Sequence, residues 1–118
     1  MIQWLETSSI YLHRDSVDFR KAINGLAVIV SEHMELALLD SAIFVFCNKR
    51  RDQIKVLYWD QTGFALWQKR LEQDKFKWPR KHTAATITLS HEQWLWLLRG
   101  FDITRLKPHN RLMFSEVS

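Results

Sequence analysis

The alternation of apolar and polar positions is clearest between residues 43 and 79, where it predicts three successive β-strands. Residues 43–47 form an unbroken apolar run, rich in branched and aromatic side chains and too short for a typical helix, which favours a strand buried on both faces. Residues 54–59 and 64–71 have strand-like patterns and are joined by a link from Asp60 to Gly63. Asp bonds to nearby amides and Gly tolerates positive φ, so this link suits a tight turn. We predict a three-stranded antiparallel meander.

Side chains of the second and third strands divide between two faces. If Asp60 and Gly63 face each other, one face carries Lys55, Leu57, Trp59, Phe64, Leu66 and Arg70, and the other carries Ile54, Val56, Tyr58, Ala65, Trp67, Lys69 and Leu71. Neither face is polar enough to be left in water. We expect helices on one face, and on the other either the chain's own helices or an exposed aromatic patch that supports self-association or a partner.

The flanking segments predict two more strands and two helices. Residues 8–13 are typical of a strand, and Asp15 or Ser16 would cap an amphipathic helix over residues 16–32. Residues 83–89 alternate as a fourth strand, and Ser90 with Gln93 forms a capping-box pattern before a helix that Gly100 should end. The apolar stripe of that helix is expected to be Trp94, Leu97, Leu98 and Phe101.

These elements predict the fold class and the domain organisation. We expect an α+β domain over residues 1–102, in which an antiparallel β-meander sheet is packed by two or more helices. Residues 103–118, which contain a proline and several basic groups, are expected to form a basic C-terminal tail.

Composition agrees with one globular domain. The chain has 118 residues, 47% hydrophobic and 25% charged, which suffices for a single core. Cys47 is the single cysteine and lies inside an apolar run, so it is expected to be a packed thiol in a reducing compartment. No apolar run approaches the roughly 20 residues that span a bilayer, and the N-terminus does not resemble a signal peptide. We therefore expect a cytoplasmic protein without membrane contact.

Positive charge is clustered. The formal net charge is +4, but residues 49–51, 75–82 and 105–111 are basic while residues 32–40 are acidic. Local potential governs phosphate binding, so a polyanion is a reasonable partner. In the second cluster, cations alternate with Phe76 and Trp78, as in proteins that bind single-stranded nucleic acid or a sugar-phosphate backbone. The alternative is that both rings tuck beneath the sheet.

The strand and loop positions of these cations yield a candidate nucleic-acid-binding surface. Its expected members are Lys49, Arg50, Arg51, Lys55, Lys69, Arg70, Lys75, Lys77, Trp78, Arg80 and Lys81. Contacts to phosphates position a protein without reading bases, so binding should be tolerant of sequence. The alternative is a solvated loop with no ligand.

The sequence offers no pattern that indicates catalysis. With three glycines it has no Gly-rich phosphate loop, and its Cys and His residues lack zinc-ligand spacing. Asp15, Asp18, Asp60 and Glu72 follow no spacing rule that would bring them to one divalent cation. We predict no catalytic residue, no metal site and no cofactor.

The chain resembles the TnpB-type accessory proteins of insertion-sequence family sixty-six, which are distinct from the RNA-guided nuclease of the same name. The resemblance covers residues 11–102 and is most specific over residues 44–79. It is carried by residues 18–21, 25–26, 44–46, 48, 50–52, 55–60, 63–64, 66–67, 69–72 and 76–79, and weakly by 97–98 and 100. Ser41 and Asp74 depart from the pattern, which usually has Gly at both positions.

The resemblance implies a non-catalytic role in DNA transposition beside a larger transposase that holds the acidic catalytic residues. Implied partners are that transposase and DNA at the element ends, and the expected aromatic patch adds a homo-oligomer. Two functions remain open. The protein is either a DNA-binding accessory module or an interaction subunit that holds the transposase without touching DNA.

Overall fold

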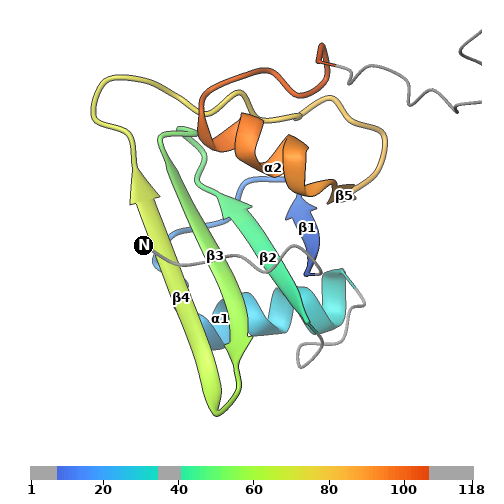
Figure 1. Ribbon diagram of the computed structural model, residues 1–118. Helices are drawn as coiled ribbons and strands as arrows, with labels where there is room; N and C mark the ends of the chain where they lie inside the picture. Colours follow the sequence, from blue (N-terminus) through green and yellow to red (C-terminus); the bar gives the residue numbers. More distant parts are fainter. Residues whose placement is uncertain (1–7, 35–40, 107–118) are drawn as a thin grey trace, which may run out of the picture.

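The computed structural model describes residues 8–34 and 41–106 and has an α+β fold (Figure 1). Five strands form one sheet in the order β4-β3-β2-β1-β5. The strands are β1 (Ser9–His13), β2 (Ala42–Cys47), β3 (Gln53–Asp60), β4 (Gly63–Arg70) and β5 (Thr86–Leu89). The helices are α1 (Ile23–Val28), which continues as the π-helical turn η1 (Ile29–His33), and α2 (His91–Leu98). The predicted α+β class, with a sheet packed by two helices, is confirmed.

The predicted meander is confirmed in its order and its register. Strands β2, β3 and β4 pair antiparallel, with Asp60 opposite Gly63 and Trp59 opposite Phe64. Gln61, in the turn, adopts a φ of 55°. The pleat therefore divides β3 and β4 between two faces as the alternation predicts.

The sheet as a whole is mixed, which corrects the prediction of a purely antiparallel sheet. Strand β1 pairs with β2 in parallel, with Ser9 opposite Ala42, whereas β5 pairs with β1 antiparallel. Two adjacent parallel strands require a crossover connection, since a tight turn would reverse the chain direction. That connection contains α1 and η1.

Every residue of β2 is buried, so both faces of the sheet are covered. Ile43, Val45 and Cys47 face a first core cluster that includes Trp94 and Leu97 of α2. Phe44 and Phe46 face a second cluster, which contains the buried side of α1 and η1. The two helices therefore lie against opposite faces of the sheet (Figure 1).

The expected aromatic patch is largely absent from the described part of the chain. Trp67 and Trp96 pack against the first cluster, and Trp59 meets Phe64 edge-to-face at 5.0 Å between ring centroids. Within residues 8–34 and 41–106, the large apolar side chains that stay exposed are Val28, Leu95 and Phe101. The chain's own elements supply most of the cover.

The first helix is shorter than predicted and begins at Ile23 instead of near Ser16. Neither Asp15 nor Ser16 caps it, because the N-cap residue is Ala22, which has no side-chain cap hydrogen bond. The reason for the late start lies in β3, where the Lys55 ammonium donates to the carbonyl oxygens of Phe19 and Lys21, each at 2.9 Å. Those oxygens are ones that a longer helix would use for its own bonds. Lys55 thus fixes an irregular approach to α1.

The C-terminal helix follows the prediction closely. Ser90 and Gln93 form the capping box, and Gly100 at φ 91° closes α2 with a backbone bond from Phe101 to Trp96. Phe101 is an exception to the expected stripe, because the turn at Gly100 carries it outward and leaves it 50% exposed.

Two boundaries also differ from expectation. Strand β5 begins at Thr86, three residues later than predicted. Ile103, just past the expected domain boundary, is buried in the first cluster. Most of the expected tail, residues 107–118, lies outside the described residues, as do residues 35–40.

Replacing Lys55 by methionine should destabilise the protein. Methionine fills similar space but leaves the carbonyls of Phe19 and Lys21 without their donor, so we expect a loss of about 2–4 kcal/mol. Urea denaturation would measure it, and Lys75→Met, at an exposed position, should change stability by less than about 0.5 kcal/mol. Equal stability of the native chain and Lys55→Met would show that the ammonium does not hold this segment.

Cys47 should resist alkylation in the folded protein. Its side chain is buried, and burial raises the pKa of the thiol to about 12, so almost no thiolate exists at pH 8. We expect iodoacetamide to modify Cys47 only after denaturation, and mass spectrometry of the treated protein would measure the modification. Rapid labelling without denaturant would contradict this packing.

Candidate nucleic-acid interface

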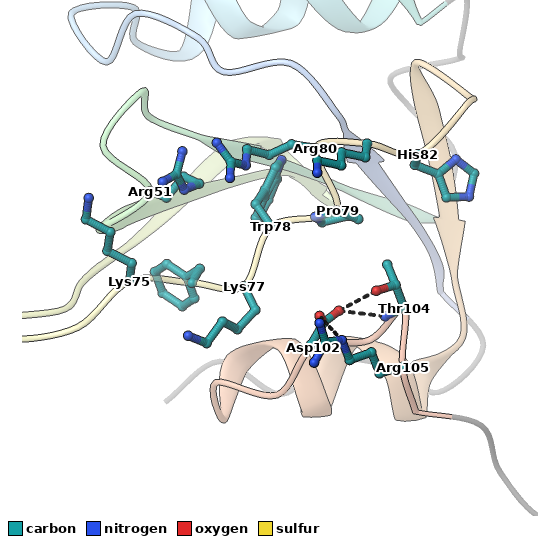
Figure 2. A pocket seen from close by; sticks show the side chains of 12 residues that line it. Arg51, Lys75, Lys77, Trp78, Pro79, Arg80, His82, Asp102, Thr104 and Arg105 are labelled. Atoms are coloured by element: carbon teal, nitrogen blue, oxygen red, sulfur yellow. Dashed lines mark hydrogen bonds and ion pairs between the residues drawn. The ribbon is translucent and has the colours of Figure 1, made fainter.

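A basic groove of about 650 Å³ lies at the end of the sheet where β2 turns into β3 (Figure 2). Three segments line it: the tip of the β2–β3 loop, the chain between β4 and β5, and the turn after α2. Its six Lys and Arg residues are Arg51, Lys75, Lys77, Arg80, Lys81 and Arg105, against the single carboxylate of Asp102. Four of these six lie between Lys75 and Lys81.

Backbone hydrogen bonds hold the first two segments together. The N–H of Phe76 donates to the carbonyl of Arg51 at 2.8 Å, and the N–H of Leu71 donates to that of Asp52 at 2.7 Å. The chain that leaves β4 is thereby fastened to the β2–β3 loop. Cations that lie more than 20 residues apart in sequence meet at one groove.

The aromatic residues of this segment point into the core. Phe76 is 1% exposed and Trp78 is 7% exposed, and both belong to the first core cluster. The indole N–H of Trp78 donates to the carbonyls of Arg14 at 3.0 Å and His13 at 3.3 Å. The interpretation that both rings tuck beneath the sheet is confirmed. Trp78 is therefore a core residue and not a ring on which bases stack. This corrects the prediction that Trp78 belongs to the nucleic-acid-binding surface.

Alternation along the segment explains the orientation of its cations. Where Phe76 and Trp78 turn inward, Lys75 and Lys77 turn outward and are exposed. Figure 2 shows the side chains of Lys77 and Asp102 on neighbouring walls of the groove. The burial of Phe76 and Trp78 thus leaves the side chains of Lys75 and Lys77 on the solvent side of the segment.

The β2–β3 loop is closed by its own side chains. The amide of Asn48 donates to the carboxylate of Asp52 at 2.6 Å, and Arg51 adopts a φ of 62°. This hydrogen bond, with the nearby charges of Arg50 and Lys75, lowers the pKa of Asp52. Asp52 forms no ion pair with the loop cations in the described part of the chain, so their charge stays available to a ligand.

Lys49 and Arg50 line a second hollow, of about 410 Å³, beside residues 16–19. Arg51, the next residue, lines the main groove. The loop therefore presents cations to two neighbouring hollows. All three of its predicted cations lie at the surface that these hollows form.

Arg105 and His82 line the groove but were missing from the expected contacts. Asp102 caps the turn that carries Arg105, accepting from the N–H of Thr104 at 3.0 Å and from its hydroxyl at 2.5 Å. Arg105 itself lies 3.4 Å from the Asp102 carboxylate, and the Thr104 bonds together with this charge lower the pKa of Asp102. Gly100 indicates in the sequence that the chain turns after the helix, but it does not indicate that the turn brings Arg105 to the groove.

Three other expected contacts lie outside the groove. Lys55 is 7% exposed and its ammonium is bonded to two carbonyls, so it is a structural residue and not a surface cation. Lys69 is half-buried in β4 opposite Ile54. Arg70 is exposed but pairs with Glu72 at 3.1 Å. The structure therefore narrows the candidate surface to the loop and the 75–82 segment, joined by the turn after α2.

Five of the six groove cations form no ion pair in the described part of the chain, and the exception is Arg105, which lies beside Asp102. Among the described residues, no ion pair involves Arg51 or the four cations between Lys75 and Lys81. Residues 8–34 and 41–106 also contain no group of three His, Cys, Asp or Glu side chains that could hold a metal ion. No helix in the described segments is long and apolar enough to cross a membrane. The geometry suits a polyanion.

Comparison with known proteins places the chain in a family. The family model described as IS66 Orf2 like protein matches residues 8–108. The uncharacterized protein y4jC of Sinorhizobium fredii is 38% identical over 91 residues, which cover 77% of each chain. The uncharacterized protein y4hO of the same bacterium is 33% identical over 93 residues, covering 79% of this chain and 80% of that protein. No solved structure matches. The chain belongs to the IS66 Orf2-like proteins, a family associated with insertion-sequence transposition.

Proposed function

We propose that this protein is a non-catalytic, cytoplasmic accessory factor of DNA transposition that contacts DNA through its basic groove. The observation that carries the proposal is the convergence of six Lys and Arg side chains from three segments on one groove. Clustered cations create a local potential that attracts a phosphate backbone and releases its counterions.

The chemistry of the groove supports binding instead of catalysis. Its one carboxylate, Asp102, is engaged by Thr104 and Arg105 and has a lowered pKa, so it is a poor proton donor or acceptor at neutral pH. All the groove cations except the half-buried Arg51 are exposed, and backbone hydrogen bonds already fix the segments that carry them. Little ordering is then needed when a ligand binds.

The alternative is an interaction subunit that holds the transposase and does not touch DNA. In that case an acidic surface of the transposase would meet the same groove cations. Salt-dependent binding to DNA in the absence of transposase separates the two functions. Self-association is a further proposal that light scattering would test.

Binding to duplex DNA that contains the element ends should depend steeply on salt. If about four phosphates are neutralised, log affinity should fall with log salt at a slope of roughly −3 to −4. We expect similar affinity for unrelated duplexes, because phosphate contacts do not read bases. Fluorescence anisotropy over a salt series would measure both quantities.

Removing charge from the groove should weaken this binding and reduce the slope. The combined substitutions Lys77→Gln, Arg80→Gln and Lys81→Gln should lower the magnitude of the slope by about 2–3. The matched control is Arg20→Gln, Lys21→Gln and Arg99→Gln, which removes the same charge at exposed positions outside the groove. Equal losses in the two triple variants would indicate attraction by net charge alone.

The loop cations should contribute independently. Replacing Arg50 and Arg51 together by alanine should weaken binding uniformly across sequences and lower the magnitude of the slope by about 1–2. The fold should persist, because the contact of Arg51 with Phe76 uses its backbone carbonyl. Replacing both arginines by lysine instead should preserve the slope.

A folded Arg50→Ala, Arg51→Ala protein with unaltered affinity would mean that the loop is merely solvated. Absence of any DNA binding at low salt, together with salt-sensitive capture of the transposase, would support the interaction subunit instead.

A further inference from the structure

We infer that the groove binds the backbone of duplex DNA and discriminates against single strands, an inference that rests on the proposed function. Proteins that hold single strands combine a basic track with exposed aromatic rings on which bases stack. Here the sequence contains both components, but the fold keeps only one of them at the surface.

The two rings between the groove cations are unavailable to bases. Phe76 and Trp78 are buried, and the indole N–H of Trp78 is committed to the backbone of β1 and the residue after it. Turning Trp78 outward would break those bonds and open the first core cluster. Both residues are among those that line the groove, but at 1% and 7% exposure neither ring offers a face on which a base could stack.

The remaining ring of the groove is His82, which is held in place by hydrogen bonds with Ala84 and Arg14. Its Nδ1 accepts from the N–H of Ala84 at 3.0 Å, and its carbonyl accepts from Arg14 at 3.1 Å. Phe101 is the exposed aromatic side chain nearest in sequence to the groove residues, but it does not line the groove. Neither residue forms part of a row of rings.

The cations, by contrast, extend beyond the groove itself. Arg51 faces the main groove while Lys49 and Arg50 line the neighbouring hollow, so positive charge continues across the β2–β3 loop. Such a track matches a ligand with regularly spaced phosphates whose bases need no cover. Duplex DNA satisfies this because its bases already stack inside the helix, and it carries more charge per unit length than a single strand.

The test compares a duplex with a single strand of the same sequence and length at one salt concentration. Because the single strand gains no stacking and releases fewer counterions per phosphate, we expect the duplex to bind on the order of five- to tenfold more tightly. The triple groove variant should lose most of that duplex affinity. A single strand that binds as tightly as the duplex, or more tightly, would overturn the inference.

Substitution of the groove histidine provides a second measurement. His82→Asn removes the ring while its side-chain oxygen can still accept from Ala84, and it should leave the ratio of duplex to single-strand affinity unchanged. A selective loss of single-strand affinity in this variant would show that His82 stacks on bases and would contradict the inference. Phe101→Ala, at a position outside the groove, serves as the control for the loss of an exposed ring.

The outcomes also separate this inference from the proposed function. Tight single-strand binding that the triple groove variant abolishes would refute duplex preference yet leave the groove as the DNA site. Failure of both duplex and single strand to bind would remove the proposed function and the inference together.

Discussion

Burial of the central strand on both faces is the constraint on which the rest of this structure depends. All six residues of β2 are buried, so apolar layers must form above and below it. One layer comes from α1 and η1, which the parallel crossover places beneath Phe44 and Phe46. The other needs more than α2, and Phe76 and Trp78 complete it. The basic groove is a consequence, because anchoring these two rings fixes the chain that carries its cations.

Lys55 shows how neighbouring segments decide the role of a charged residue. Seen in the sequence, it is one of several cations around the meander, and its strand position puts it on the same face of the sheet as Leu57 and Phe64. In the fold, residues 19–21 pass over it, and their carbonyls satisfy its ammonium while the Phe19 ring lies 4.8 Å from Nζ. Lys55 thereby delays the start of the first helix to Ile23, and it is not one of the cations available to DNA.

Features governed by local periodicity were predictable from the sequence. The meander register follows from the turn between Asp60 and Gly63, and the start of α2 follows from the capping box at Ser90, because each depends on residues a few positions apart. The parallel pairing of β1 with β2 depends on residues about 33 positions apart, and no local pattern encodes it. The place of Arg105 in the groove likewise depends on where the chain turns after Gly100, which is a tertiary property.

The alternation of cations and rings in residues 75–78 carried two interpretations because periodicity fixes which side chains share a side but not which side meets water. The core settles that question, since covering β2 requires the rings. The same choice limits the chemistry of the surface. The side chains that stay at the surface are flexible cations, which can contact phosphates at varied positions. The rigid rings of Phe76 and Trp78, which could stack on bases, are buried in the core. A groove built in this way has the means to hold a nucleic acid by its backbone, and specificity for an element end would have to come from DNA shape or from the transposase.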